Sequence, residues 1–225
     1  MSAERLEFER AAGTGLRDGA TVAVLLHGRG SHRGDLQALA PVLPEGWGLV
    51  TPQAPFPGVP WGYGPGWAWY RYVAENRLVP ETLEQSLGLL DDFLERLPDL
   101  LGFTPGPIVL GGFSQGGTTS VAYALSRPGR ITAALNFSGF LAASVEVPTG
   151  AAARGATPVF WGHGTKDPNI PFGLAVDGRA RLHEAGVPLT VKDYAIGHWM
   201  VPEEIHDAVA MVQGVVDTGQ SPGPA

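Results

Sequence analysis

Residues 107–126 read PIVLGGFSQGGTTSVAYALS, in which one serine lies among four glycines between two apolar runs. The run 107–112 predicts a strand and the run 117–126 predicts a helix. Residues 112–116 fit the pattern G-x-S-x-G, which in this setting predicts a tight turn that lifts the Ser114 side chain clear of the backbone. Short patterns of this kind also occur by chance, so a glycine-rich turn with an incidental serine is the alternative. The strand–turn–helix setting favours a nucleophile.

The rest of the chain alternates short β-rich runs with longer helical patterns. This order predicts an α/β fold with a mostly parallel central sheet and helices on both faces. In such sheets, active groups gather in the loops beyond the carboxyl ends of the strands. We predict a single domain over residues 1–225, with a flexible tail from about residue 214. The predicted strands are 21–26, 47–52, 107–112, 131–139, 157–164 and 187–195, and the predicted helices are 35–43, 80–101, 117–126, 172–186 and 202–216.

Composition narrows the classes of function. The net charge is −7 and no basic run occurs, which argues against a nucleic-acid partner. The chain has no cysteine, so disulfides and cysteine chemistry are excluded. No apolar run approaches the ~20 residues that span a membrane, and the first ten residues lack the apolar core of a signal peptide. We therefore expect a soluble, cytoplasmic protein without stable membrane insertion.

A serine nucleophile needs a base, and the base needs a carboxylate that orients it. Hydrolases with an α/β fold present these groups in the chain order serine, acid, histidine. His198 lies in the loop between the last predicted strand and the last predicted helix, on the same sheet edge as Ser114, and we predict that it is the base. The other downstream histidines fit less well, because one lies only four residues before the candidate acid and two lie inside helical patterns. They are His163, His183 and His206.

The candidate acid is Asp167, in the segment GHGTKDPNIP at the end of the predicted strand 157–164. It lies between Ser114 and His198 in chain order and at the carboxyl end of a strand. Because Asp-Pro is common turn chemistry, a turn residue is the alternative. Three roles filled in the right order at three strand ends favour a catalytic triad.

An ester hydrolase also needs N–H donors for the oxyanion that forms during the reaction. We assign one to the backbone of Gln115, at the start of a predicted helix, where the helix dipole also helps. The second donor is expected in a glycine-rich loop after an early strand, and HGRG (27–30) lies there, which assigns the backbone N–H of Arg29. A phosphate-binding loop is disfavoured because both nucleotide-binding glycine patterns are absent. No helical pair of histidines suggests a metal site, so we expect neither metal nor cofactor.

The stretch 52–70, PQAPFPGVPWGYGPGWAWY, is dense in proline, glycine and aromatic residues and cannot hold regular structure for long. Its aromatic residues favour an ordered loop, and its tryptophans either cap the core or form one wall of an apolar acyl cleft. We predict the second, and we assign Trp67, Trp69 and Trp199 to substrate binding. Whether this loop acts as a lid is left open.

Taken together, the segments LLHGRG, PQAP followed by GWAWY, GGFSQGG, GHGTKDPNIP and GHWMVPEEI make the chain resemble the phospholipase/carboxylesterase family of α/β-hydrolases, which includes acyl-protein thioesterases. The resemblance extends from about residue 22 to 205. It implies an α/β-hydrolase fold without a separate lid domain, and hydrolysis of carboxylic esters or thioesters without a cofactor. It also implies the same five site residues, and a possible homodimer, since several members are homodimers. These residues are Arg29, Ser114, Gln115, Asp167 and His198.

One departure from the family bears on the substrate. Thioesterase members usually carry an uncharged residue at the position of Arg29, and here the following loop, GSHRGD, adds further basic residues. This favours a serine carboxylesterase acting on small-molecule esters over a lysophospholipase or acyl-protein thioesterase. A cationic loop also favours substrates with an anionic group, unless Arg29 pairs with Asp35. The alternative from a different class is a non-catalytic ligand receptor that keeps the hydrolase fold.

Overall fold

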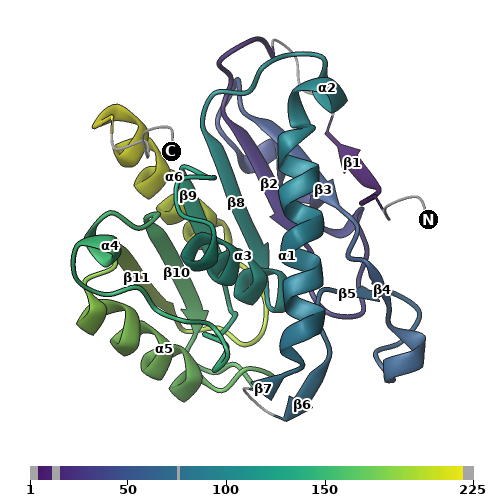
Figure 1. The fold of residues 1–225 in the computed structure, drawn as a ribbon, viewed down its shortest axis with the longest axis vertical. Coiled ribbons are helices and arrows are strands. Elements are labelled where there is room, and N and C mark those ends of the chain that lie inside the picture. The colour runs from purple at the N-terminus through teal and green to yellow at the C-terminus, as the bar shows by residue number, and fades with distance from the viewer. Residues whose placement is uncertain (1–4, 12–15, 75–76, 220–225) are drawn as a thin grey trace.

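The computed structural model describes residues 5–11, 16–74 and 77–219. A seven-stranded sheet with the order β1-β3-β2-β8-β9-β10-β11 forms its centre (Figure 1). The edge strand β1 pairs with β3 in antiparallel orientation, and all other neighbouring strands are parallel. The strands are β1 (Phe8–Arg10), β2 (Val22–Leu26), β3 (Gly48–Pro52), β8 (Ile108–Phe113), β9 (Ala133–Phe137), β10 (Val159–Gly164) and β11 (Leu189–Tyr194). The predicted mostly parallel α/β sheet is confirmed.

Helices cover both faces of this sheet (Figure 1). They are α1 (Pro80–Glu95), α2 (Leu97–Leu101), α3 (Gln115–Ser126), α4 (Gly150–Arg154), α5 (Phe172–Ala185) and α6 (Pro202–Asp217), together with two short 3₁₀ helices, η1 (Asp35–Val42) and η2 (Val59–Trp61). Two small hairpins, β4 (Phe56–Pro57) with β5 (Trp67–Ala68) and β6 (Tyr72–Ala74) with β7 (Arg77–Leu78), lie outside the main sheet.

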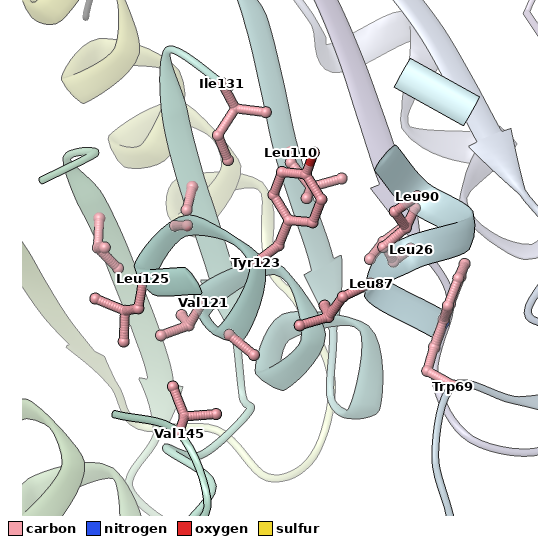
Figure 2. Close-up of a cluster of buried hydrophobic side chains, with 14 of the residues drawn as sticks. Leu26, Trp69, Leu87, Leu90, Leu110, Val121, Tyr123, Leu125, Ile131 and Val145 are labelled. Carbon is pink, nitrogen blue, oxygen red and sulfur yellow. The ribbon is translucent and has the colours of Figure 1, made fainter. Parts of the chain in front are cut away.

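The alternation of side chains along the strands divides the core between the two faces. Val24 and Leu26 of β2 pack with α1, α3 and α5 on one face, whereas Ala23 and Leu25 pack with η1 on the other face, which α6 also covers. Figure 2 shows the first cluster, in which leucines of α1 meet leucines of β2 and β8, with Trp69 beside them. The carboxyl ends of the parallel strands therefore lie at one edge of a sheet that is packed on both sides.

Several boundaries differ from the predictions. The expected helix 80–101 is divided into α1 and α2 at Arg96, because Pro98 has no N–H to continue the helical hydrogen bonds. The segment expected as the helix 35–43 is a 3₁₀ helix that contains Pro41. The last helix continues to Asp217, so a tail beginning near residue 214 is placed too early, and residues 220–225 lie outside the described residues.

The sequence analysis predicted neither the four short hairpin strands and η2 nor two further elements, β1 and α4. The edge strand β1 is three residues long and mostly exposed, so it carries no apolar alternation, and α4 is a single short helical segment. No helix in the described part of the chain is long and apolar enough to cross a membrane.

Candidate active site

Ser114 lies between β8 and α3 in a strained turn. Its backbone has φ 54° and ψ −113°, a region that side-chain-bearing residues rarely occupy. The turn passes so close to β2 that a Cβ atom added to Gly112 would lie 2.5 Å from the Leu26 carbonyl oxygen, and one added to Gly116 would lie 2.1 Å from it. Only glycine fits at these two positions, which explains the spacing of the motif.

His198 and Asp167 come together at the ends of neighbouring strands. The loop after β10 carries Asp167 and the loop after β11 carries His198, and β10 and β11 are paired in parallel. His198 Nδ1 lies 2.6 Å from Asp167 Oδ2. Because a carboxylate only accepts hydrogen bonds, Nδ1 carries the proton and Nε2 is the free basic atom. The histidine is therefore oriented as a general base requires.

The Asp167 carboxylate is held firmly in place. Its side chain is fully buried, and Oδ1 accepts the backbone N–H groups of Asn169 (2.8 Å) and Ile170 (2.9 Å). Two backbone N–H donors and the imidazole N–H thus satisfy the oxygens of this buried side chain. Asp167 is thus a buried acceptor facing His198 as well as a turn residue.

Of the other histidines downstream of Ser114, only His163 approaches this pair, with its Nε2 3.7 Å from Asp167 Oδ2. His163 is completely buried, its Nε2 lies 2.9 Å from the Ile170 carbonyl oxygen, and burial lowers its pKa. It packs beneath the loop that carries Asp167. His183 and His206 are exposed on α5 and α6.

Ser114 and His198 line the same cleft, whose volume is about 450 Å³. The ring of Phe113, next to the serine, packs against the His198 imidazole with 4.6 Å between the ring centroids. Within the described residues no hydrogen bond joins the two side chains. The cleft is lined by Gly28, Arg29, Ser31, Asp35, Tyr72, Ala74, Phe113, Ser114, Asn169, Ile170 and His198.

The two predicted oxyanion donors belong to different elements. Gln115 is the first residue of α3, where a backbone N–H has no acceptor within the helix. Arg29 follows β2, in a loop fixed by hydrogen bonds from Gly30 N–H to the Trp67 carbonyl and from Trp67 N–H to the Ser31 carbonyl, both 2.8 Å long. In the part of the chain that the structure describes, neither the Arg29 nor the Gln115 N–H has a protein acceptor.

Of the tryptophans assigned to substrate binding, Trp69 is contradicted by the structure, and Trp67 and Trp199 are not brought into the lining of the cleft. Trp69 is fully buried, and its indole N–H donates to the His27 carbonyl (3.0 Å). Trp67 lines a separate hollow formed with the N-terminal segment, and the Trp199 side chain is 56% exposed. None of the three lines the cleft that holds Ser114. Trp67 and Trp69 support the loop after β2 instead. The Trp67 backbone and the Trp69 indole N–H form hydrogen bonds with backbone groups of that loop.

Two supporting side chains escaped the sequence analysis. The buried Gln115 amide accepts the Trp69 backbone N–H and donates to the Tyr70 carbonyl, each at 2.7 Å. His27 is buried, its Nε2 accepts the Ala54 N–H (3.1 Å), and burial lowers its pKa to about 4. No signal in the sequence marked them, because both residues lie in glycine-rich turns after predicted strands, where polar side chains are common.

Comparisons with known proteins agree with this fold. A profile of the phospholipase/carboxylesterase family matches residues 15–215. An acyl-protein thioesterase 1 of Eremothecium gossypii is 28% identical over 214 residues, which cover 89% of this chain and 90% of that protein. A probable carboxylesterase of Oryza sativa subsp. japonica is 32% identical over 149 residues, which cover 61% of each protein. The alignments with proteins named acyl-protein thioesterase 1 span 61% of that of Kluyveromyces lactis, 90% of that of E. gossypii and 51% of that of Saccharomyces cerevisiae.

Among solved structures, a Bacillus cereus carboxylesterase superposes with a TM-score of 0.78 at 20% identity, covering 95% of this chain and 96% of that one. At this identity the likeness concerns the fold alone. The family assignment follows from the profile, which covers most of the described structure, including every strand of the sheet except β1. The chain therefore belongs to the phospholipase/carboxylesterase family of α/β-hydrolases.

Proposed function

We propose that this protein is a serine carboxylesterase that hydrolyses small carboxylic esters through an acyl-enzyme on Ser114. The observation that carries the proposal is the pairing of His198 Nδ1 with the buried Asp167 carboxylate, beside a serine held in a strained turn at the same cleft. Membership of the family supports the same chemistry.

In the proposed reaction, His198 Nε2 removes the proton of the Ser114 hydroxyl as its oxygen attacks the ester carbonyl carbon. Asp167 keeps the imidazole in place and stabilises its positive charge. The N–H groups of Arg29 and Gln115 donate to the oxyanion of the tetrahedral intermediate. The C–O bond then breaks, and the proton on Nε2 passes to the departing alcohol.

A water molecule completes the cycle. It attacks the acyl-enzyme carbonyl while His198 accepts its proton, a second tetrahedral intermediate collapses, and the proton returns to Ser114. The products are the carboxylic acid and the free serine enzyme. Neither half-reaction needs an oxidant, a reductant or a metal.

The walls of the cleft favour small, polar substrates over long acyl chains. Arg29, Ser31, Asp35 and Asn169 contribute to the lining, and the tryptophans lie elsewhere. Burying a long alkyl chain against charged and amide groups gives up their hydration without compensation. Thioester hydrolysis is the second candidate because several relatives are named acyl-protein thioesterases.

The test is intact-mass analysis after incubation with a fluorophosphonate, on the wild type and on Ser114→Ala. We expect one adduct on the wild type and none on the variant, since only an activated serine reacts at neutral pH. Rates on 4-nitrophenyl esters of increasing chain length, and on matched thioesters, then separate the two candidates. No adduct on either protein would reject an activated Ser114 and favour a non-catalytic receptor.

A further inference from the structure

We propose that the Arg29 side chain binds a carboxylate on the substrate, so that the preferred substrates are esters that carry a second, anionic carboxyl group. This inference rests on the proposed esterase function, because it concerns the cleft that holds Ser114. It assigns separate roles to two parts of one residue: the backbone N–H for the oxyanion and the guanidinium for the substrate anion.

The Arg29 guanidinium is held beside the cleft by two aromatic rings. Its Cζ atom lies 5.0 Å from the Tyr63 ring centroid and 5.2 Å from the Tyr72 ring centroid. Both Arg29 and Tyr72 line the cleft. Cation–π contacts of this kind orient a guanidinium while its N–H edge stays available for an anion.

The two rings are themselves fixed. The Tyr63 hydroxyl accepts the backbone N–H of Tyr72 (2.8 Å), and the Tyr72 ring packs against Phe140 with 6.0 Å between centroids. Burial raises the pKa of Tyr72, so this phenol is neutral at physiological pH and does not cancel the charge of Arg29. The Arg29 guanidinium therefore packs between two fixed aromatic rings, neither of which carries a negative charge.

The neighbouring charges in the loop are engaged elsewhere. Arg33 forms ion pairs with Glu7 and Glu9 on the outer side of β1. Asp35, which also lines the cleft, accepts the Ser31 hydroxyl at 2.7 Å. Among the described residues no carboxylate forms an ion pair with Arg29, so the pairing with Asp35 considered from the sequence does not occur. Arg29 is the cation of this loop that faces the cleft.

Geometry limits where the substrate carboxylate lies. The Arg29 N–H is the proposed donor to the reacting carbonyl oxygen, so the guanidinium is within one arginine side chain of the ester. When a carboxylate lies a few bonds from the ester, the ester carbonyl can reach the Arg29 N–H while the carboxylate reaches the guanidinium. Monoesters of short dicarboxylic acids and acyl esters of hydroxybenzoic acids have this spacing. An arginine binds such a planar group through two parallel N–H···O bonds.

The experiment compares carboxylates with carboxamides of the same shape. One pair places the charge on the alcohol side, 4-acetoxybenzoate against 4-acetoxybenzamide. The other places it on the acyl side, monomethyl glutarate against methyl 4-carbamoylbutanoate. For each pair, the ratio of kcat/KM for the anionic ester to that for the neutral ester is measured at neutral pH and low salt.

For the wild type we expect the anionic ester to be preferred about five- to tenfold in at least one pair, as for a charged hydrogen bond at a partly exposed site. In Arg29→Gln this ratio falls to about one, and Arg29→Lys retains part of it. Arg71→Gln removes the same charge from an exposed residue outside the cleft lining and keeps the wild-type ratio. The ratio cancels any change in rate that the substitution causes on neutral esters.

Two further measurements keep the test decisive if Arg29→Gln does not fold. In the wild type, added salt lowers the ratio because the pair is solvent-accessible. In Asp35→Asn the ratio rises, because a negative charge leaves the cleft. Equal ratios in the wild type and Arg29→Gln, an equal loss in Arg71→Gln, or a ratio insensitive to both salt and Asp35→Asn would each overturn the inference. Failure of the esterase proposal itself is recognised separately, by the absence of fluorophosphonate labelling and of hydrolysis of the neutral esters.

Discussion

The two walls of the cleft are built in different ways. One wall, called the triad wall after the proposed catalytic residues, consists of the loops 165–171 and 195–201 after β10 and β11. The other, the oxyanion wall, consists of the loop 27–35 after β2 and the aromatic segment 56–72 that supports it. The triad wall is held by a buried carboxylate that bonds its own loop and His198. The oxyanion wall is held by several contacts with segments far apart in the chain, such as Trp69 N–H on Gln115 Oε1 and the ion pairs of Arg33 with Glu7 and Glu9.

Because of this difference, substitutions in the two walls are expected to affect activity and the free energy of unfolding to different degrees. In the triad wall, one side chain can be altered while the loop keeps its backbone hydrogen bonds. In the oxyanion wall, the side chains that support the donor loop are also part of the core, so a change there weakens folding and catalysis together. Substitutions in the two walls are therefore expected to give different ratios of lost activity to lost stability.

The largest effect on activity is expected from Asp167→Asn. The amide oxygen can still accept the Asn169 and Ile170 N–H groups, but the NH₂ group then faces His198 Nδ1 and forces the proton onto Nε2. A histidine in that tautomer cannot accept the serine proton, and kcat/KM on a 4-nitrophenyl ester falls about 10³–10⁴-fold. The free energy of unfolding from urea titration changes by less than about 1 kcal/mol. A loss of activity below tenfold would contradict the assignment of Asp167.

The oxyanion wall is tested by Gln115→Leu. The substitution keeps the backbone N–H but leaves the Trp69 N–H and the Tyr70 carbonyl without their partners in a buried site. Each unsatisfied group costs about 1–3 kcal/mol, so the free energy of unfolding is expected to fall by about 2–6 kcal/mol. Activity is expected to fall with it, because the α3 N-terminus and the aromatic segment lose their connection.

Gln213→Leu serves as the control for this substitution. Gln213 is exposed on α6, and its replacement is expected to change stability by less than about 0.5 kcal/mol. If Gln115→Leu were as stable as this control, the Gln115 amide would not hold the wall.

The same contrast explains what the sequence could predict. Strand ends in a parallel sheet meet at one edge, so chain order was enough to place Ser114, Asp167 and His198 together. The aromatic segment has no such rule, because composition indicates aromatic packing but not which face each ring covers. Trp69 was therefore assigned to the cleft, although its indole N–H is used inside the core. The pairing of Arg29 with two tyrosines likewise depends on contacts between distant segments.

The smallest effects concern pH, because a buried titratable group near each wall has a shifted pKa and the two shifts, those of His27 and Glu204, have opposite signs. Burial lowers the pKa of His27, below the oxyanion wall, from 6.5 to about 4. Burial also raises the pKa of Glu204, at the start of α6 behind the triad wall, from 4.5 to about 8. Within the described residues neither Glu204 carboxyl oxygen has a hydrogen-bond partner, and the group packs against Gly162.

The two groups act on stability with opposite signs. Between pH 4 and 6.5 the unfolded chain carries a proton on His27 that the native protein lacks, so stability rises with pH. Between pH 4.5 and 8 the native protein holds a proton on Glu204 that the unfolded chain has lost, so stability falls as pH rises. Each contributes a slope of up to about 1.4 kcal/mol per pH unit. The slopes oppose each other where the windows overlap, and Glu204 acts alone from pH 6.5 to 8.

Replacing each group separates the two contributions in urea titrations at several pH values. Glu204→Gln removes the fall in stability from pH 6.5 to 8 and uncovers a rise from pH 4.5 to 6.5. His27→Gln makes the slope over that lower range more negative, with the lowered pKa of His163 still contributing a rise, and leaves the upper range as in the wild type. His206→Gln, an exposed position on the same helix as Glu204, is the control for the effect of a substitution alone. If the free energy of unfolding depended on pH in the same way for all four proteins, neither His27 nor Glu204 would be buried in its uncharged form. The contrast between the walls would then be limited to their hydrogen bonds.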